Sequence, residues 1–475
     1  MLRSLPLFKP ALMVGALVLA SAGVDSAPRT QRKQAQPLSA AAQAETPTPT
    51  VRCGDDDRLA LKRDPVNGAD LQFAQSDPRG YLVQLADLAV ERSRLVGMAQ
   101  LLSLAAQDEL KEAEWASRPE ASLSLSTVGA STGVSGGATH SRAEGRATLS
   151  VAGVLWDGGQ RRQLIEWRKQ LVEAAQAARQ GQAEQIALQT VALSLDRSRY
   201  TLQLQIYRQY VRKMACLVES LDAITQFDKG RSSEWVQAQK QQQQAELALA
   251  STQDYLQSVE TRLKRLVGDP LPPPGSLSAV LIRVPELAAL QKDLLASPEV
   301  AQSTAQALAA QRQADALAAG QGPRLNWVLN GSAVAARGGN NSHDAAAGLQ
   351  VTIPLYRPSD TPARDAARRR AEAVNLARDE SLDAKNWRLM EVHDAASNSL
   401  DRARRIAELL RSSQQLRGAT LQQWQQLGRR SLFDVMGAES DYYMLRIQQI
   451  NALYDAQQAV ALMGSMGRGV GALLR

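Results

Sequence analysis

The stretch LSVAGVLWDGG (residues 149–159) recurs 200 residues later as LQVTIPLYRPS (residues 349–359). Two further pairs of segments repeat in the same order and at nearly the same spacing: RPEASLSL (118–125) with GPRLNWVL (322–329), and GRSSEW (230–235) with GRRSLF (428–433). Three matches in one order indicate an internal duplication. Each half is therefore expected to contain a strand hairpin followed by a long helical hairpin.

Alternation of apolar and polar residues predicts the strands. In residues 121–127, Leu123 and Leu125 fall on one face and serines fall on the other, which is the period-two pattern of a strand. Strands of roughly ten residues are long enough to cross a membrane when they are tilted. We expect strands at about 119–128, 146–156, 324–333 and 346–356, and exposed loops at 129–142 and 331–344.

A small soluble β-layer would show the same alternation, so the membrane interpretation needs further support. Each second strand ends in an aromatic residue, Trp156 or Tyr356, at a position typical of a membrane-interface anchor. No segment after the N-terminal region approaches the about 18 consecutive apolar residues of a transmembrane helix. Any membrane-spanning part is therefore expected to be made of strands.

Long segments without internal proline follow each predicted hairpin. At 1.5 Å per residue, the first helix of each half reaches on the order of 100 Å, and a helix of that length requires partner helices along it. Apolar and small residues at alternating spacings of three and four supply a packing seam. Gly230 and Gly428 mark the turns at the hairpin tips. We expect helices at about 160–228, 232–267, 360–427 and 431–466.

The N-terminal residues have the pattern of an export signal. Arg3 and Lys9 precede a short apolar stretch that ends in the small-residue cleavage pattern Ala20-Ser21-Ala22. An N-terminal membrane anchor is the alternative. The expected layout is a signal peptide (1–22), a disordered segment (23–76), a first repeat (77–267), a Pro-rich linker (268–285), a second repeat (286–467) and a tail (468–475).

Composition argues against a large globular core and against nucleic-acid binding. Only 4% of the 475 residues are aromatic, which is low for a chain of this length. The formal net charge is +7, but acidic and basic residues are interspersed and no long run of bases occurs. Nucleic-acid binding proteins concentrate their bases in such runs or patches. No nucleic-acid partner is therefore expected.

The cysteines and histidines do not form a recognisable metal site. Cys53 and Cys216 are far apart in sequence, and two alternatives stay open: a disulfide between them, or a buried free thiol at Cys216. His140, His343 and His393 are scattered without ligand spacing and are expected at the surface. We expect no metal and no cofactor.

The predicted strands cannot form a closed barrel within one chain. Four strands fall short of the about eight that a barrel needs, and open strand edges are not tolerated in lipid. Several copies must therefore share one barrel, which the long helices would extend into a hollow tube. Such an assembly would conduct material through a membrane.

The repeat of strand hairpin and long helical hairpin, with GRRSLFDVMGAESDYYMLR (428–446) at the second tip, resembles the TolC family of outer-membrane channel components over about residues 80–467. The resemblance implies a homotrimer in the outer membrane, with a shared twelve-strand barrel and an α-helical periplasmic tunnel. It implies two partners, a periplasmic membrane-fusion adaptor and an inner-membrane ABC or other transporter. The form of the tip motif is closer to members that serve type I secretion of protein toxins than to members that serve drug efflux, which is the alternative.

The same resemblance implies a periplasmic gate at the tips. Gly428 matches the glycine that opens the tip, and Arg430 matches the arginine that ties neighbouring hairpins closed. Asp434 matches the first of two aspartates that ring the tunnel constriction. The second aspartate of that pattern is Gly437 here, so one acidic ring is missing.

The partner of the gate arginine also differs. In the first repeat its aspartate falls on Val236, and Glu234, two residues earlier, is the candidate substitute. Asp434 also has a simpler interpretation as a carboxylate near a helix start, where it interacts favourably with the helix dipole. Both roles are compatible, because a first-turn carboxylate of three copies would still converge at a narrow pore.

No catalytic site is expected. The chain lacks the Walker lysine motif, the GxSxG motif and any recognisable Ser/His/Asp or Cys/His set. A periplasmic coiled-coil structural or adaptor protein is the alternative of another class, but lipoyl-like regions are not recognisable. The sequence therefore predicts a passive channel with mainly helical structure and a membrane β-barrel part.

Overall fold

The computed structural model describes residues 77–132, 140–273, 277–336, 341–427 and 431–475. Several predictions concern residues outside these ranges and stay predictions: the signal peptide (1–22), the N-terminal segment (23–76), Cys53, Gly428 and Arg430.

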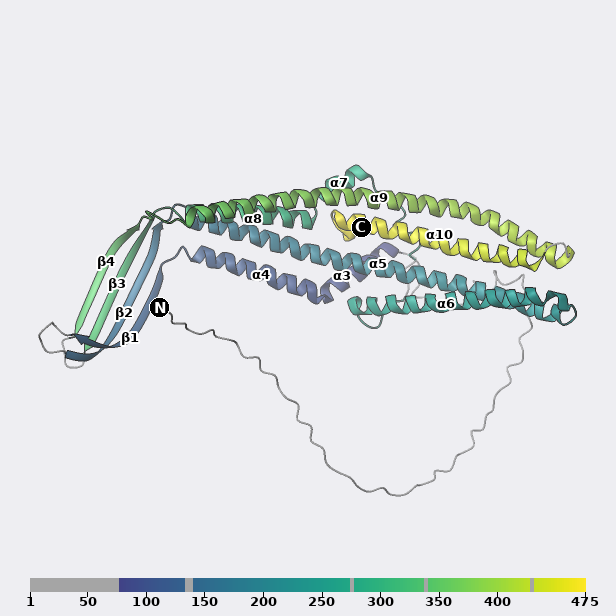
Figure 1. Cartoon of the computed structure of the whole chain (residues 1–475), viewed down its shortest axis with the longest axis horizontal. Coiled ribbons are helices and arrows are strands. Elements are labelled where there is room, and N and C mark those ends of the chain that lie inside the picture. Colours follow the sequence, from purple (N-terminus) through teal and green to yellow (C-terminus); the bar gives the residue numbers. More distant parts are fainter. Residues whose placement is uncertain (1–76, 133–139, 274–276, 337–340, 428–430) are drawn as a thin grey trace, which may run out of the picture. The chain divides into compact units, whose positions relative to one another are not determined.

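The described elements alternate between helices and two pairs of strands (Figure 1). The first half contains α3 (Pro78–Arg92), α4 (Arg94–Trp115), β1 (Glu120–Thr132), β2 (His140–Trp156), α5 (Gln160–Thr225), the short 3₁₀ helix η1 (Lys229–Arg231) and α6 (Ser232–Val267). The second half contains α7 (Leu287–Leu294), α8 (Pro298–Ala319), β3 (Arg324–Ala336), β4 (Ser342–Thr352), α9 (Asp360–Leu427), α10 (Leu432–Met466) and α11 (Val470–Leu474). The mainly helical fold with a strand part is confirmed.

Two very long helices set the scale of the fold. Helix α5 has 66 residues and α9 has 68, so each is about 100 Å long. The turn from β2 into α5 needs glycine, because Gly158 and Gly159 adopt φ of 66° and 88°. Asp157 fixes this turn by accepting hydrogen bonds from the backbone N–H groups of Gly159 and Arg161.

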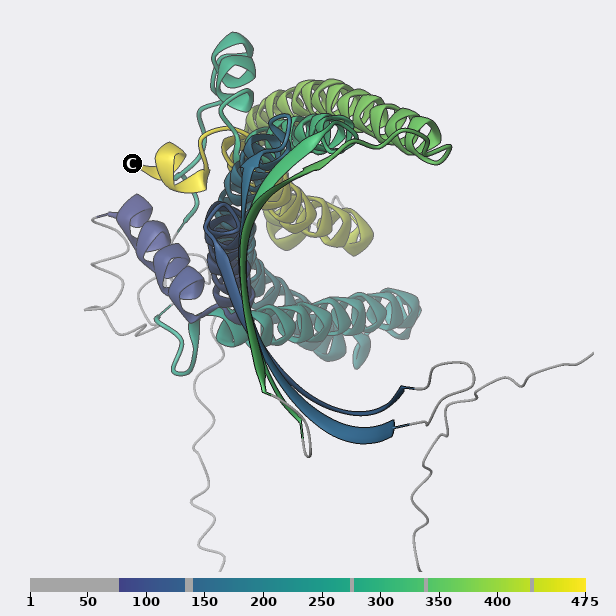
Figure 2. The ribbon, with the colours of Figure 1, turned by 90° about the vertical axis from the view of Figure 1, so that its left-hand side faces the viewer.

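The shorter helices pack in pairs along the two long ones. Helix α5 contacts α4 and α6 as well as α8 and α10, and α9 contacts α8 and α10. In Figure 1, α4 and α6 follow one another along α5, while α8 and α10 follow one another along α9. Figure 2 looks along the long helices and places α6 and α9 at opposite ends of the set. The order across the set is therefore α4 and α6, then α5, then α8 and α10, then α9.

The strands form one antiparallel sheet in the order β1-β2-β3-β4. Its hairpins are longer than the sequence indicated, since Thr132 still pairs with His140 and Val334 with Ser342. The expected loops at 129–142 and 331–344 were therefore too long, because backbone ladders continue through Gly, Ser and Ala without an apolar alternation. The end of β4 was also wrong: it stops at Thr352.

The described part of the Pro-rich segment between the two repeats packs against the helices. Leu277, Val280 and Leu281 are 1–3% exposed and belong to a core shared by α3, α5, α6, α9 and α10. The buried side chain of Gln457 accepts hydrogen bonds from the N–H groups of Val280 and Leu281. Residues 268–285 were predicted as a linker from their prolines, but they include apolar anchors that these contacts bury.

A buried tyrosine joins the same core. Tyr454 of α10 is fully buried, and its hydroxyl hydrogen-bonds Ser198 of α5 over 2.7 Å. Burial raises the pKa of Tyr454 to about 12, although the Ser198 hydrogen bond acts in the opposite direction. The hydroxyl of Ser198 in turn accepts from the N–H of Leu277. The two repeats and the segment between them are thus joined by specific polar contacts.

Candidate functional site

The sheet has one face that is apolar over most of its length, with His343 and Thr127 near the outer end of the hairpins. The strand register places Leu123 beside Leu149, Gly331 and Ala345, and it places Leu125 beside Ala147, Ala333 and His343. Because side chains alternate between faces, whole rows of the sheet share one side. The large apolar side chains of this face are Leu123, Leu125, Leu149, Val151, Leu325, Trp327, Leu329, Leu349 and Val351.

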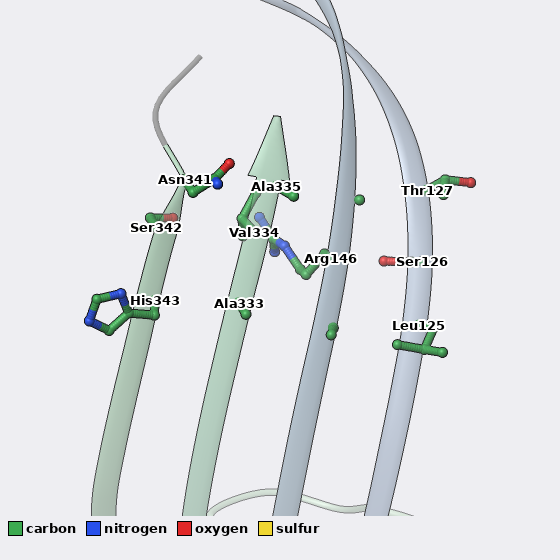
Figure 3. A pocket seen from close by; sticks show the side chains of 12 residues that line it. Leu125, Ser126, Thr127, Arg146, Ala333, Val334, Ala335, Asn341, Ser342 and His343 are labelled. Carbon is green, nitrogen blue, oxygen red and sulfur yellow. The ribbon is translucent and has the colours of Figure 1, made fainter. Parts of the chain in front are cut away.

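The opposite face is polar. Ser150 and Asn330 lie side by side in the register, and the Ser150 hydroxyl donates to Asn330 Oδ1 over 2.6 Å. Ser332 and Asp344 form a second cross-strand contact. Near the far end of the hairpins, Arg146 extends between β2 and β3 in a shallow depression that all four strands line (Figure 3). A sheet with one apolar face and one polar face fits contact with lipid on the apolar side and contact with water on the polar side.

The apolar face is open to its surroundings. Leu123 is 65% exposed, Leu125 76% and Leu349 70%. A soluble protein would normally cover side chains of this size, since large exposed apolar patches mark a contact with a partner or a membrane. The exposure therefore argues against the soluble β-layer.

The base of the sheet carries aromatic residues. Trp327 lies against Gly153 of the neighbouring strand, where an added Cβ would be 2.5 Å from the indole nitrogen. Trp156 ends β2 and is 53% exposed. Tyr356 is 85% exposed but follows β4 instead of ending it, because Pro354 has no N–H to continue the ladder. Both predicted anchors lie at the end of the sheet that joins the helices, and their role stays a prediction.

The tip of the second helical hairpin contains Asp434. Asp434 is exposed in the first turn of α10, and the N-cap is Ser431, whose hydroxyl accepts from the Asp434 N–H over 3.3 Å. This position suits the favourable interaction of a carboxylate with the helix dipole. It is equally compatible with a pore charge, which stays a prediction because the proposed latch, Arg430, lies outside the described residues.

The first tip has its own turn. Gly230 lies in η1, and its N–H donates to the Asp228 carboxylate over 3.0 Å. Glu234 follows in the first turn of α6 and is partly buried. Its oxygen Oε2 is buried without a hydrogen-bond partner among the described residues. Gly230 lies in this turn, and its role as a hairpin tip and the latch role of Glu234 both stay predictions.

A buried ionic cluster joins three helices behind the second tip. Glu439 of α10 is fully buried, 3.6 Å from Lys213 Nζ of α5 and 3.5 Å from Arg417 Nη1 of α9. The Arg417 guanidinium also lies over the ring of Tyr442, 4.4 Å from its centre. Around the cluster, Tyr210 and other apolar residues of α5, α6 and α10 form a tip core. Sequence reasoning missed Glu439, because a charged residue in a helix usually faces water and the packing of three helices buries this one.

Cys216 of α5 is disulfide-bonded. Cys53 lies outside the described residues, so their pairing stays a prediction. None of the described helices combines the length and the apolar character that a membrane-crossing helix requires.

No protein-family model and no curated protein matches the sequence. Solved structures do match. The outer membrane protein VceC from Vibrio cholerae aligns with a TM-score of 0.72 at 17% identity, covering 82% of this chain and 97% of VceC. The CmeC outer membrane channel of Campylobacter jejuni aligns with a TM-score of 0.70 at 14% identity, covering 82% and 86%. This chain has the fold of outer-membrane channels.

A third match, CusC, has been described in connection with transmembrane channel formation. It aligns with a TM-score of 0.72 at 18% identity, covering 82% of this chain and 92% of CusC. The match spans most of both chains in each case, so the sheet and the long helices belong to one shared architecture. The likeness establishes the fold, and the expected resemblance to channel components is confirmed at that level.

Proposed function

We propose that the chain is one subunit of a passive outer-membrane exit channel. The observation that carries the proposal is the sheet with an exposed apolar face and a polar opposite face, attached to helices about 100 Å long. In a closed barrel the apolar face would contact lipid and the polar face would line a water-filled pore. The shared fold with VceC and CmeC supports this assignment.

The two edges of the chain explain how several copies would close into a ring. Strand β1 and helices α4 and α6 form one edge of the chain, while β4 and α9 form the other. Repeating this unit pairs β4 of one copy with β1 of the next, and it places α9 beside α4 and α6. Three copies would supply twelve strands, above the about eight that a closed barrel requires. The proposed assembly is therefore a homotrimer in the outer membrane, with a helical periplasmic tunnel.

The partners and the cargo are finer parts of the proposal. We infer that the tips contact a periplasmic membrane-fusion adaptor and an inner-membrane ABC or other transporter, with Asp434, Arg430 and Glu234 at the gate. Export of a protein toxin or similar cargo by type I secretion rests on the form of the tip motif. Small-molecule efflux is the alternative function. An adaptor that never enters the membrane is disfavoured by the exposed apolar face of the sheet.

The test is a matched pair of substitutions on neighbouring positions of β1. Leu125 and Ser124 lie at the same depth but on opposite faces. A lysine or arginine on the lipid face near the bilayer middle costs about 2–4 kcal/mol. Leu125→Lys should therefore reduce the trimer recovered from the outer membrane, whereas Ser124→Lys should leave it unchanged. Equal recovery of both variants, or a wild-type chain found only as a soluble monomer by fractionation and native mass, would refute the proposal.

A second experiment separates the cargo classes. In the source organism, loss of the gene should remove a protein from the culture medium if the channel serves type I secretion. Increased sensitivity to toxic small molecules without a change in secreted proteins would assign the alternative.

A further inference from the structure

A cleft lined by four arginines lies where α3, α4, α5 and α6 meet. Its volume is about 760 Å³, and none of the described residues that line it is acidic. Ile186 and Gln189 of α5 line it together with residues of the surrounding helices. The arginines are Arg92, Arg94, Arg262 and Arg265.

The cleft concentrates positive charge. Within the described residues, no ion pair or hydrogen bond engages any of the four guanidinium groups. Gly268 has φ of 107°, and an added Cβ there would lie 2.9 Å from Arg92 Cζ, so the glycine allows close approach of this arginine. Arginine binds carboxylates with paired N–H groups, which makes convergent arginines suited to acidic side chains.

The opposite edge of the chain presents the complementary charge. Helix α9 buries Leu389, Val392 and Ala396 against its own chain. The residues on its opposite side, at helical spacing, are exposed. Exposed residues on that side include Trp387 and the acidic residues Glu380, Asp383, Glu391, Asp394 and Asp401. Arg388 pairs with Glu391 and Arg404 with Asp401, and Asp394 lies 3.7 Å from His393 Nδ1, while no ion pair is found for Asp383 within the described residues.

The two features lie at the same distance along the helices. Ile186, which lines the cleft, follows the first residue of α5, Gln160, by 26 residues, and Asp383 follows the first residue of α9, Asp360, by 23. The arginine cleft is formed by α4 and α6 at one edge, and the acidic face belongs to α9 at the other edge. Within one chain, α5 and α8 or α10 separate the two. A neighbouring copy in a ring would bring them together.

We propose that the arginine cleft receives the acidic face of α9 of a neighbouring copy, with Asp383 and Asp394 as the residues that enter it. Trp387, 65% exposed between them, would pack on the apolar rim of the cleft at Leu95, which is 46% exposed. Arg and Trp are the residues that most often dominate interface energies. The inference rests on the ring of the proposed function and adds the residues that set its register and direction.

The experiment reverses the charges on each side and then on both. Arg262→Glu with Arg265→Glu juxtaposes like charges, and so does Asp383→Arg with Asp394→Arg. Juxtaposed like charges at an interface are strongly unfavourable, so each pair should lower the association constant of the trimer at least about tenfold. The quadruple variant, which carries all four substitutions, should recover most of the wild-type association constant. Arg179→Glu, at an exposed site on α5, is the matched control and should assemble normally.

Oligomer mass in detergent as a function of concentration provides the measurement. Assembly of the Arg262→Glu/Arg265→Glu variant at the level of the control would overturn the inference, as would failure of the exchanged variant to recover. If inorganic phosphate stabilises the wild type but not the Arg262→Glu/Arg265→Glu variant, and if both assemble equally, the cleft is instead a site for free anions. In these cases the wild-type ring, and with it the proposed function, would stand. A wild-type chain that forms no ring would overturn both.

Discussion

Replacing Glu439 tests how the helical tip is held together. Its buried carboxylate lies 3.5–3.6 Å from the charged nitrogens of Arg417 and Lys213. At an effective dielectric constant of about 20, two unit charges at that distance attract by about 5 kcal/mol. Desolvation of the three charges cancels much of this attraction. The net cost of removing one partner of a buried ionic group is about 3–5 kcal/mol.

Glu439→Gln preserves the side-chain volume and removes the charge, leaving two cations facing a neutral amide. We expect the tip segments of α5, α9 and α10 to open more readily, with amide hydrogen exchange there about a hundred- to a few-thousand-fold faster. Hydrogen exchange read out by mass spectrometry on the assembled protein resolves these segments. Glu173→Gln, at an exposed position of α5, is the control.

A compensating variant separates lost charge pairing from general disruption. Combining Glu439→Leu with Lys213→Met and Arg417→Met replaces the ionic cluster by apolar side chains of similar volume. Such replacements are often neutral or stabilising, so protection at the tip should return close to the wild-type level. The reasoning is refuted if Glu439→Gln exchanges like the Glu173→Gln control.

Three further predictions concern other parts of the chain. Gly153→Ala should lower stability by about 1–3 kcal/mol because the new methyl group overlaps the Trp327 indole; urea unfolding in detergent should show this, while Gly348→Ala, with open space around it, should change little. Asp434→Asn should lower the cation selectivity of the pore about twofold or more in planar bilayers, and unchanged selectivity would exclude a pore charge there. Burial raises the pKa of Glu184 above its usual 4.5, although a backbone hydrogen bond from α11 acts in the opposite direction. The folded state therefore holds this proton more tightly, so stability from Glu184 is fully present below about pH 4.5 and is lost as pH rises. Glu184→Gln should make the melting temperature less dependent on pH in this range and at least as high at pH 7, and a steeper dependence would contradict this.

Local patterns predicted the elements that have a strong period. The strand containing Leu123 and Leu125 was visible because apolar and serine residues alternate, and α5 because proline is absent over its length. The outer ends of the hairpins were not visible, since their Gly, Ser and Ala side chains carry no periodic signal while the backbone ladder continues through Thr132. The local sequence therefore predicts a strand only where apolar and polar side chains alternate, because the two faces of the sheet lie in different environments.

The polar residues that matter most to packing were harder to find. Ser431 was predictable, because a serine three residues before Asp434 is a common N-cap pattern. Glu439 was not, since a charged residue in a helix usually faces water and only the packing of α5, α9 and α10 buries this one. The arginine cleft was hidden for a related reason: Arg92 and Arg265 belong to helices separated by most of the first repeat.

The positions of these two charged clusters imply that tip opening and ring assembly are separable. The Glu439 cluster lies within one chain, so its loss should loosen the tip without changing the mass of the oligomer. The arginine cleft lies at an edge of the chain, so reversal of Arg262 and Arg265 should change the oligomer while the tip of each copy keeps its hydrogen-exchange protection. A double-mutant comparison measures this directly: the effects of Glu439→Gln and of the charge reversal should add, because distant sites without shared partners are independent. Strong non-additivity would show instead that the tip is stabilised through contacts between copies, and that opening the channel requires the ring interface to change.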